Sequence, residues 1–158
     1  MKPQLLLVVG NIGSGKSTKV KYLAQQGWII ISRDALRYMI GGSKYRFDFS
    51  LEQYIRKSSL AVLEVFLKSK KNIVIDDVNI SRRWRAIYVK LAKKYNYELR
   101  AHVLPRLTKK ESVDRRLSNN HGDYTRFTWN IVWERFNLVY QMPTLKEGFD
   151  SITIEEKV

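Results

Sequence analysis

One short stretch near the N-terminus constrains the fold more than any other part of the sequence. It fits the pattern G-x-x-x-x-G-K-[ST] at every fixed position, with the residues Gly10, Asn11, Ile12, Gly13, Ser14, Gly15, Lys16 and Ser17. The apolar run at 5–9 predicts a buried strand before it, and 16–26 predicts a helix after it. This context of strand, glycine-rich turn and helix is the one that the pattern requires.

The chemistry of this turn favours binding of a phosphate chain. Glycines let successive backbone N–H groups point inward as an anion nest, and the helix N-terminus adds partial positive charge. Lys16 would contact the β- and γ-phosphates of ATP, Ser17 would ligate Mg²⁺, and Thr18 completes the expected ATP-binding segment. The alternative is an ordinary glycine turn, and the motif together with its context argues against it.

Strands and helices alternate along the rest of the chain. Further strands are predicted at 28–31, 72–75, 97–104 and 151–154, and helices at 35–40, 50–69, 81–95, 108–117 and 128–141. Ser50 with Gln53 and Thr108 with Glu111 are capping-box candidates, and Ser81 is a candidate N-cap. The alternation predicts an α/β fold, a parallel sheet with helices on both faces, in a single domain over 1–158.

The charge balance indicates a polyanionic partner. Lys and Arg number 29 against 15 Asp and Glu, a formal net charge of +14. Solubility needs a net charge of only about 2–8, and such an excess favours nucleic acid over a membrane surface. The absence of cysteine excludes a thiolate nucleophile and Cys-ligated metals. No apolar run is long enough for a membrane span, so a cytoplasmic protein is expected.

A carboxylate and an arginine follow the second predicted strand. Ligands of doubly wound sheets lie beyond the carboxyl ends of the strands, so Asp34 is expected on the same rim as the phosphate loop. A carboxylate there can accept the proton of an attacking hydroxyl, and Arg37 can hold a phosphate of the acceptor. On spacing alone, a simple N-cap role for Asp34 with a solvated Arg37 is favoured.

Three motifs in order carry a family resemblance: residues 10–17, Ser32-Arg33-Asp34-x-x-Arg37, and Ile75-Asp76-Asp77-x-Asn79. Over residues 2–142 the chain resembles the 5′-kinase domain of the phage polynucleotide kinase family. The resemblance implies a P-loop kinase in which Asp34 is the general base and Arg37 holds the phosphate 3′ to the acceptor nucleoside. It also implies that Asp77 supports the site electrostatically with Asn79 beside it, although Asp76 leaves that assignment open by one position.

The resemblance also implies a helical lid, at 108–127, whose arginines stabilise the transferred phosphoryl group. Arg115 best matches the first lid arginine, and the adjacent Arg116 is the alternative. Where the family often has a second lid arginine this chain has Asn119 or Asn120, and Arg126 is the candidate to replace it. Two further departures are Ala35 in place of a second acidic residue and the lack of a phosphatase domain, so no phosphatase activity is expected.

Basic and aromatic residues outside these motifs could contact nucleic acid. In the loop 44–49, Lys44 and Arg46 alternate with three aromatic residues, which either stack on bases or pack inward. A second basic cluster stands at a helix start, where cations oppose the helix dipole; it comprises Arg82, Arg83 and Arg85. Trp84, Trp129 and Trp133 are expected in the core, and neither His102 nor His121 is given a role.

The first hypothesis is a polynucleotide 5′-hydroxyl kinase that uses ATP and Mg²⁺, located in the host cytoplasm if it is phage-encoded. A second keeps the chemistry but phosphorylates a hydroxymethylated pyrimidine within DNA, or a nucleoside or other small molecule. A third is a nucleic-acid-binding module that uses ATP as a switch without transfer. The sequence leaves open DNA against RNA, the preferred end structure and the oligomeric state.

Overall fold

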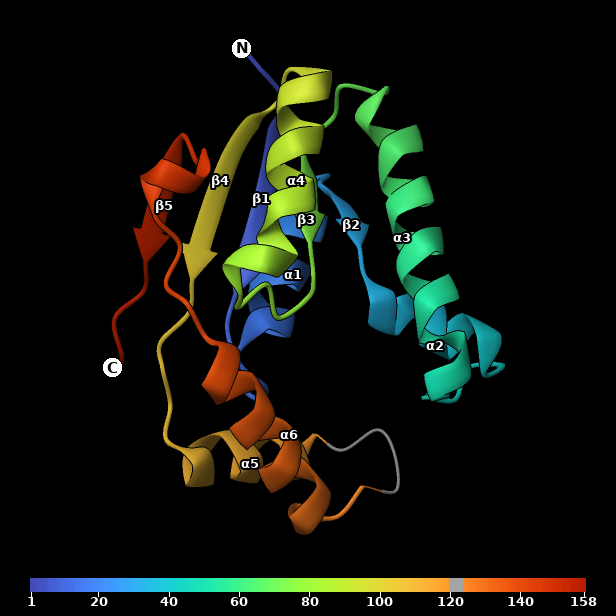
Figure 1. Ribbon diagram of the computed structural model, residues 1–158, viewed down its shortest axis with the longest axis vertical. Coiled ribbons are helices and arrows are strands. Elements are labelled where there is room, and N and C mark those ends of the chain that lie inside the picture. Colours follow the sequence, from blue (N-terminus) through green and yellow to red (C-terminus); the bar gives the residue numbers. More distant parts are fainter. Residues whose placement is uncertain (120–123) are drawn as a thin grey trace.

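The chain folds into one parallel β-sheet flanked by helices, as Figure 1 shows for a computed structural model that describes residues 1–119 and 124–158. The strands are β1 (Gln4–Val9), β2 (Ile29–Ile31), β3 (Ile73–Ile75), β4 (Glu98–Val103) and β5 (Ser151–Ile154). Their order in the sheet is β2-β3-β1-β4-β5, and every pairing is parallel. The predicted α/β architecture is therefore confirmed, and all five strands end on one rim.

The helices alternate with the strands along the chain. They are α1 (Lys16–Gln25), α2 (Arg33–Ile40), α3 (Glu52–Leu67), α4 (Arg82–Tyr95), α5 (Lys109–Ser118) and α6 (Arg126–Val139). Figure 1 places α5, which lies within the lid segment expected at 108–127, together with α6 beyond the carboxyl ends of the strands, with α2 on the opposite side of that rim. None of the described helices is long and apolar enough to cross a membrane.

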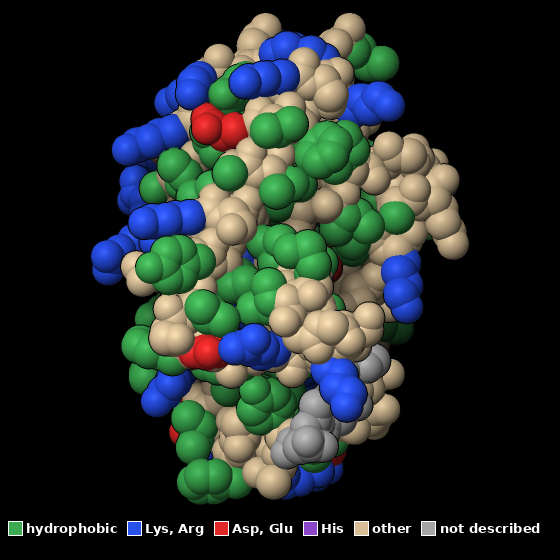
Figure 2. Space-filling model, turned by 90° about the vertical axis from the view of Figure 1, so that its right-hand side faces the viewer, with side chains coloured by type: hydrophobic (Ala, Val, Ile, Leu, Met, Phe, Trp, Pro, Cys, Tyr) green, Lys and Arg blue, Asp and Glu red, His purple; other side chains and the backbone are tan. Residues whose placement is uncertain are grey.

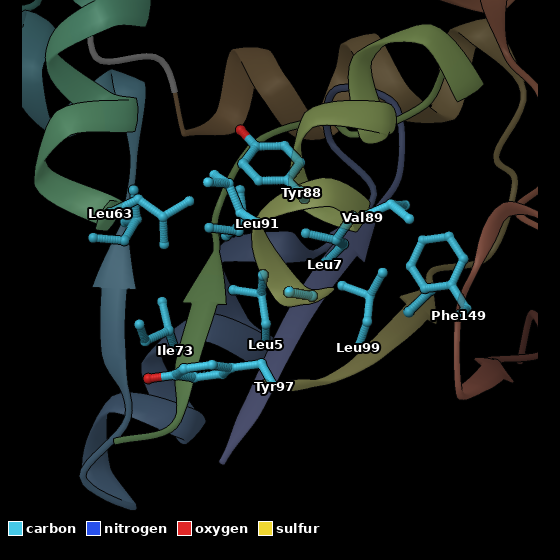
Figure 3. Close-up of a cluster of buried hydrophobic side chains, with 14 of the residues drawn as sticks. Leu5, Leu7, Leu63, Ile73, Tyr88, Val89, Leu91, Tyr97, Leu99 and Phe149 are labelled. Carbon is cyan, nitrogen blue, oxygen red and sulfur yellow. The ribbon is translucent and has the colours of Figure 1, made fainter. Parts of the chain in front are cut away.

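Two apolar layers hold the helices against the sheet. Alternate side chains of β1 point to opposite faces, because successive residues of a strand face opposite sides. Leu5 and Leu7 join the larger cluster, which α3 and α4 cover and which Figure 3 shows in part. Leu6 and Val8 pack with Val20 of α1 on the other face. The sheet is thus covered on both sides.

Two of the three predicted helix starts are confirmed. The Ser81 hydroxyl accepts a hydrogen bond from the backbone N–H of Trp84, and Thr108 with Glu111 forms a complete capping box. The Ser50 prediction is wrong. Asp48 accepts the N–H of Ser50 instead, at 3.0 Å, and a short 3₁₀ turn, Phe49–Leu51, leads into α3.

One member of the predicted basic cluster is structural. Arg85 is fully buried, and its guanidinium forms two hydrogen bonds to the carboxylate of Glu147, at 2.8 and 3.0 Å. It also donates to the backbone oxygen of Asn79 at 3.0 Å. The cluster therefore does not act as a unit: only Arg82 and Arg83 are exposed, while Arg85 ties α4 to the segment before β5.

Candidate active site at the carboxyl ends of the strands

The phosphate loop needs glycine at two of its turns. Gly13 has φ +66° and Gly15, the N-cap of α1, has φ +100°, and both values lie in the left-handed region that side chains disfavour. A Cβ on Gly13 would also lie 2.3 Å from the backbone oxygen of Ser112 in α5. The loop is therefore shaped for an anion nest and pressed closely against the lid.

Lys16 is held inside this loop. Its ammonium donates to the backbone oxygens of Gly10 and Asn11, at 2.9 and 2.8 Å. Burial lowers the pKa of Lys16 to about 8, and Asp76 is the carboxylate that opposes this shift most. Ser17 and Thr18 follow on the exposed start of α1, where a bound phosphate could reach them.

The two aspartates after β3 have different surroundings. Asp76 lies near Lys16, and burial raises its pKa to about 6, with the Lys16 charge opposing the rise. Asp77 instead forms an ion pair with Arg33, at 3.1 Å, and its side chain is almost buried. Asp76 is thus the carboxylate beside the phosphate loop, whereas Asp77 belongs to the acceptor side. The sequence had left this choice open, and only the direction of each side chain resolves it.

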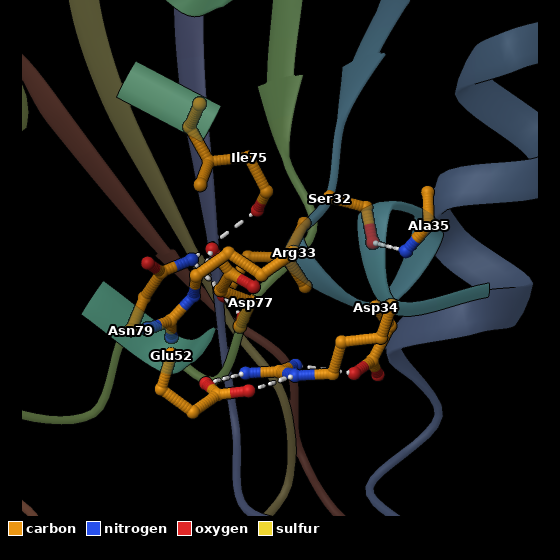
Figure 4. Close-up of polar contacts among 10 residues, drawn as sticks. Ser32, Arg33, Asp34, Ala35, Glu52, Ile75, Asp77 and Asn79 are labelled. Atoms are coloured by element: carbon orange, nitrogen blue, oxygen red, sulfur yellow. Dashed lines mark hydrogen bonds and ion pairs between the residues drawn. The ribbon is translucent and has the colours of Figure 1, made fainter. Parts of the chain in front are cut away.

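Asp34 is not the cap of its helix. Ser32 takes that role by accepting the N–H of Ala35 at 3.2 Å (Figure 4), so the N-cap interpretation of Asp34 is wrong. The carboxylate of Asp34 is half-exposed and accepts a hydrogen bond from Nη1 of Arg37 at 2.6 Å. Its charge acts on both Lys16 and Asp76, which places it on the rim of the phosphate loop.

Arg37 is held by a carboxylate that sequence reasoning missed. Glu52, at the start of α3, accepts hydrogen bonds from Nε and Nη2 of Arg37 at 2.9 and 2.6 Å. Figure 4 labels Glu52 and Asp34, and dashed lines on the facing sides of the two carboxylates mark their bonds to Arg37. The ring of Phe47 lies 5.8 Å from the guanidinium carbon. We call Asp34, Arg37 and Glu52 the acceptor clamp.

Asn79 does not offer its side chain to a substrate. It is buried, and its amide donates to the backbone oxygens of Val8, Ile75 and Asp77 at 2.9, 3.2 and 3.1 Å. Its φ of +50° is one that Asn tolerates better than most residues. The expected substrate contact is therefore corrected: Asn79 joins the ends of β1 and β3 and fixes the turn that carries Asp76 and Asp77.

The lid presents Arg116, rather than Arg115, to the phosphate loop. The Arg116 guanidinium stacks over the Trp129 ring at 4.5 Å, its Nε is buried without a hydrogen-bond partner among the described residues, and its charge reaches Lys16. Arg115 is exposed. Arg126 is held on the lid surface by Asp114, at 2.7 Å. Asn119 bonds back to the Arg115 backbone, and Asn120 lies outside the described residues.

Of the three aromatic residues of loop 44–49, one packs inward and two are exposed. Tyr45 packs edge-on against Tyr38 and Tyr124, with ring centroids 5.5 and 6.2 Å apart, while Phe47 and Phe49 are exposed. Lys44 is exposed, and Arg46 pairs loosely with Asp48 at 3.4 Å.

The tryptophans and histidines only partly match expectation. Trp129 is buried in the lid as predicted and Trp133 packs partly buried beside it, but Trp84 is exposed enough to correct its core assignment. His102 pairs with Glu155, and His121 lies outside the described residues.

The arrangement brings four chemical components to one rim. An anion nest with a buried lysine stands at the end of β1, and Asp76 follows the neighbouring strand β3. The acceptor clamp follows β2, and a lid arginine approaches from the side of β4. Such a rim can hold a nucleoside triphosphate in line with a hydroxyl group that faces a carboxylate base.

Comparisons with known proteins agree with this geometry. A profile of the AAA domain family matches residues 5–136. A bifunctional polynucleotide phosphatase/kinase of Schizosaccharomyces pombe is 26% identical over 153 residues, 94% of this chain and 32% of the relative. A protein of Autographa californica nuclear polyhedrosis virus, named as a candidate bifunctional polynucleotide kinase/RNA ligase, is 30% identical over 139 residues, 80% of this chain and 19% of that relative.

A solved structure shares both fold and sequence. A chain in the structure of the Pnkp1/Rnl/Hen1 RNA repair complex superposes with a TM-score of 0.70 at 27% identity, over 94% of this chain and 47% of that chain. This chain thus spans less than half of that chain and about a third or less of the two curated relatives.

Proposed function

This chain belongs to the AAA domain family, as the profile match over residues 5–136 shows, and from that premise we propose that it is a polynucleotide 5′-hydroxyl kinase. The resemblance to polynucleotide kinases, predicted from three motifs, is confirmed by the relatives named above. The proposed reaction transfers the γ-phosphoryl group of ATP to the 5′-hydroxyl of DNA or RNA. The observation that carries the proposal is the acceptor clamp on the rim of the phosphate loop.

Asp34 is the proposed general base. The 5′-oxygen attacks the γ-phosphorus, a new O–P bond forms, the bond to the bridging oxygen of ADP breaks, and the hydroxyl proton passes to the Asp34 carboxylate. The Asp34 side chain is half-exposed, so the proton can then leave to water. Arg37 retains N–H groups beyond those used by Asp34 and Glu52, and these suit a phosphate on the acceptor.

Positive charge for the transferred group comes from the loop and the lid. Lys16 belongs to the phosphate loop and the charge of Arg116 reaches it from the lid, and each would stabilise charge on the β- and γ-phosphate oxygens. Lys16 would exchange its bonds to the Gly10 and Asn11 backbone oxygens for phosphate oxygens, while Arg116 is already held against Trp129.

The residues present fit a magnesium ion. Mg²⁺ is usually held by one or two protein oxygens together with substrate phosphates. The described residues contain no cluster of three or more potential His, Cys, Asp or Glu ligands, whereas the Ser17 hydroxyl and the Asp76 carboxylate flank Lys16. We propose these two groups as its protein partners. When bound, the ion would neutralise phosphate charge and polarise the bond that breaks.

The acceptor is proposed to be a polynucleotide for two reasons. The clamp is built for a phosphate beside the reacting hydroxyl, which a nucleoside lacks and a nucleic acid supplies. The phosphate backbone of a nucleic acid would also match the net charge of +14. The phosphatase/kinase name of the fission yeast relative points to the same acceptor.

The test is transfer of labelled γ-phosphate to 5′-OH DNA and RNA oligonucleotides and, in parallel, to hydroxymethylated duplex DNA and free nucleosides. Label should appear at the 5′ end only. Asp34→Asn should lower kcat by about 10²–10⁴-fold, with ATP binding by calorimetry retained. Asp114→Asn, a surface carboxylate paired with Lys110 and Arg126, serves as control and should keep its activity. Equal activity of Asp34→Asn and wild type would contradict the proposal.

A further inference from the structure

A second polar cleft, of about 200 Å³, lies between α3 and α4 on the face of the sheet away from α1. The polar and aromatic side chains that give it its chemistry are Arg33, Arg56, Ser59, Trp84 and Tyr88. It lies next to the acceptor clamp along the chain, because its lining residue Arg33, which pairs with Asp77, directly precedes Asp34.

Two guanidinium groups give the cleft its charge. Arg56, in the second turn of α3, is exposed and forms no ion pair or hydrogen bond with any residue that the structure describes. Arg33 uses Nε on Asp77 and remains about a third exposed. No carboxylate lines the cleft itself. It therefore carries an unmatched positive charge that suits an anion.

An aromatic ring and a hydroxyl complete the lining. Trp84 is 38% exposed and rests edge-on against Phe136, with ring centroids 6.1 Å apart. Tyr88 is otherwise buried; Figure 3 shows its hydroxyl pointing away from the core side chains, and it has no hydrogen-bond partner among the described residues. Burial raises the pKa of Tyr88, so the hydroxyl stays protonated and can donate. A cationic floor with a half-exposed indole is the chemistry that holds a phosphate and an adjacent base.

The surface around the cleft continues the positive charge. The outer face of α4 carries Arg82, Arg83, Lys90 and Lys93, all exposed and without ion pairs within the described ranges. Figure 2, which views the molecule from the right-hand side of Figure 1, shows Lys and Arg side chains gathered along the edge on which α4 lies. An extended polyanion leaving the cleft would run along this face.

From this geometry we propose that the cleft binds the phosphate and base of an acceptor-strand nucleotide downstream of the one that is phosphorylated. The inference rests on the proposed function and deepens it: the acceptor clamp holds the reacting end, and the cleft holds the strand. The ligand class is single-stranded nucleic acid, because stacking on Trp84 requires a base that is free of its partner strand.

The test compares two acceptors, a nucleoside 3′-monophosphate, which fills the clamp alone, and a 5′-OH oligonucleotide, which would also reach the cleft. Arg56→Ala should raise KM for the oligonucleotide about tenfold without changing kcat, and should leave KM for the mononucleotide unchanged. Lys57→Ala is the matched control, since it removes the same charge from the neighbouring exposed position of α3 but does not line the cleft. Trp84→Leu should repeat the pattern of Arg56→Ala.

Equal KM increases for Arg56→Ala and Lys57→Ala would overturn the inference, because general charge would then account for binding. An Arg56→Ala increase that is the same for both acceptors would overturn it as well. Fluorescence anisotropy measures the affinity of each variant for the oligonucleotide, and this tests the cleft without relying on catalysis. If the wild type transfers no phosphate, the proposed function fails, while a lower affinity of Arg56→Ala than of Lys57→Ala would still support the cleft.

Discussion

At the residue scale, the acceptor clamp is defined by how Arg37 divides its N–H groups. Nε and Nη2 are held by Glu52 and Nη1 by Asp34, so the guanidinium is fixed before any acceptor arrives. Pre-orientation of this kind reduces the entropy lost when a substrate is bound. Glu52 therefore acts as a positioning residue, since it reaches the substrate only through Arg37.

Loss of the Glu52 charge should weaken acceptor binding more than catalysis. Glu52→Gln keeps the shape but removes half of a charge-assisted bidentate pair, which costs about 1–2 kcal/mol. We expect KM for a 5′-OH oligonucleotide to rise about tenfold, with a smaller change in kcat. Steady-state kinetics of Glu64→Gln, whose carboxylate pairs with Lys94 elsewhere on α3, provides the control. An unchanged KM in Glu52→Gln would remove Glu52 from the clamp.

The pH dependence should follow the two shifted groups beside the phosphate loop. Asp76, with its pKa raised to about 6, loses its charge as pH falls through that value. Lys16, with its pKa lowered to about 8, loses its charge as pH rises through that value. Since kcat/KM reports the free enzyme, its profile for ATP should be bell-shaped with the optimum between these values. Asp76→Asn should remove the acidic limb and keep the alkaline limb; a profile that keeps both would contradict the assignment.

Some of these residues could be predicted from sequence and others could not. Lys16 and Asp34 each follow an apolar strand closely, and parallel strands end on one rim, so their proximity follows from local pattern. Glu52 lies 15 positions from Arg37, across a loop with no regular pattern. The choice between Asp76 and Asp77 depends on which face of the strand end each occupies, and that needs coordinates.

At the element scale, helix α5 shows that a shift of one position along a helix decides which arginine faces the phosphate loop. Successive residues of an α-helix are about 100° apart, so Arg115 and Arg116 point in different directions. The capping box fixes where the helix begins, and Val113 packs toward the loop residue Ile12. That packing turns Arg116 toward the loop and Arg115 toward solvent.

Alanine substitutions of Arg115 and Arg116 should have clearly different effects on the rate of phosphoryl transfer. Arg116→Ala should lower kcat by about 10³-fold or more, as for other arginines that stabilise phosphoryl transfer, while Arg115→Ala should stay near the wild-type value. The two variants differ by one position and carry the same charge change, so each controls the other. Single-turnover transfer measures the difference, and equal losses would contradict the assignment of Arg116.

The start of α3 marks the limit of prediction for elements. Ser50 and Gln53 have the spacing of a capping box, but Asp48 competes successfully for the Ser50 N–H and begins the helix differently. Asp and Ser are both good N-cap residues, so the local sequence does not show whether Asp48 or Ser50 begins the helix. The body of the helix was predictable because its apolar spacing repeats over several turns.

At the scale of the whole molecule, a buried ion pair joins distant parts of the chain. Arg85 and Glu147 lie 62 positions apart, and their contact attaches the segment before β5 to α4. The sequence placed Arg85 in a basic cluster that could contact nucleic acid, because nothing near it reveals a carboxylate that folding brings close. Long-range pairing and the strand order are the features that local pattern does not contain.

Removal of one partner of this pair should destabilise the fold. Glu147→Gln leaves the Arg85 charge buried and unpaired, which costs about 3–5 kcal/mol. Urea unfolding should show this loss, whereas Glu64→Gln, in an exposed pair, should cost about 0–1 kcal/mol. The double variant Arg85→Met/Glu147→Met should recover much of the loss, because no charge remains buried. A Glu147→Gln variant as stable as Glu64→Gln would contradict this account.

Arg37 contacts the proposed base Asp34 and is also proposed to contact the acceptor, and this has a consequence for the protein before an acceptor binds. While the Asp34 carboxylate accepts a hydrogen bond from Arg37, it is a weaker base toward a stray water molecule, which would protect bound ATP from hydrolysis in the proposed kinase. In the proposed reaction an acceptor phosphate would bind the remaining N–H groups of the same guanidinium and share its positive charge, which would make the Asp34 carboxylate a better base once the alcohol stands next to it. Phosphoryl transfer would then start only when an acceptor that carries a phosphate is bound, and not whenever ATP fills the site.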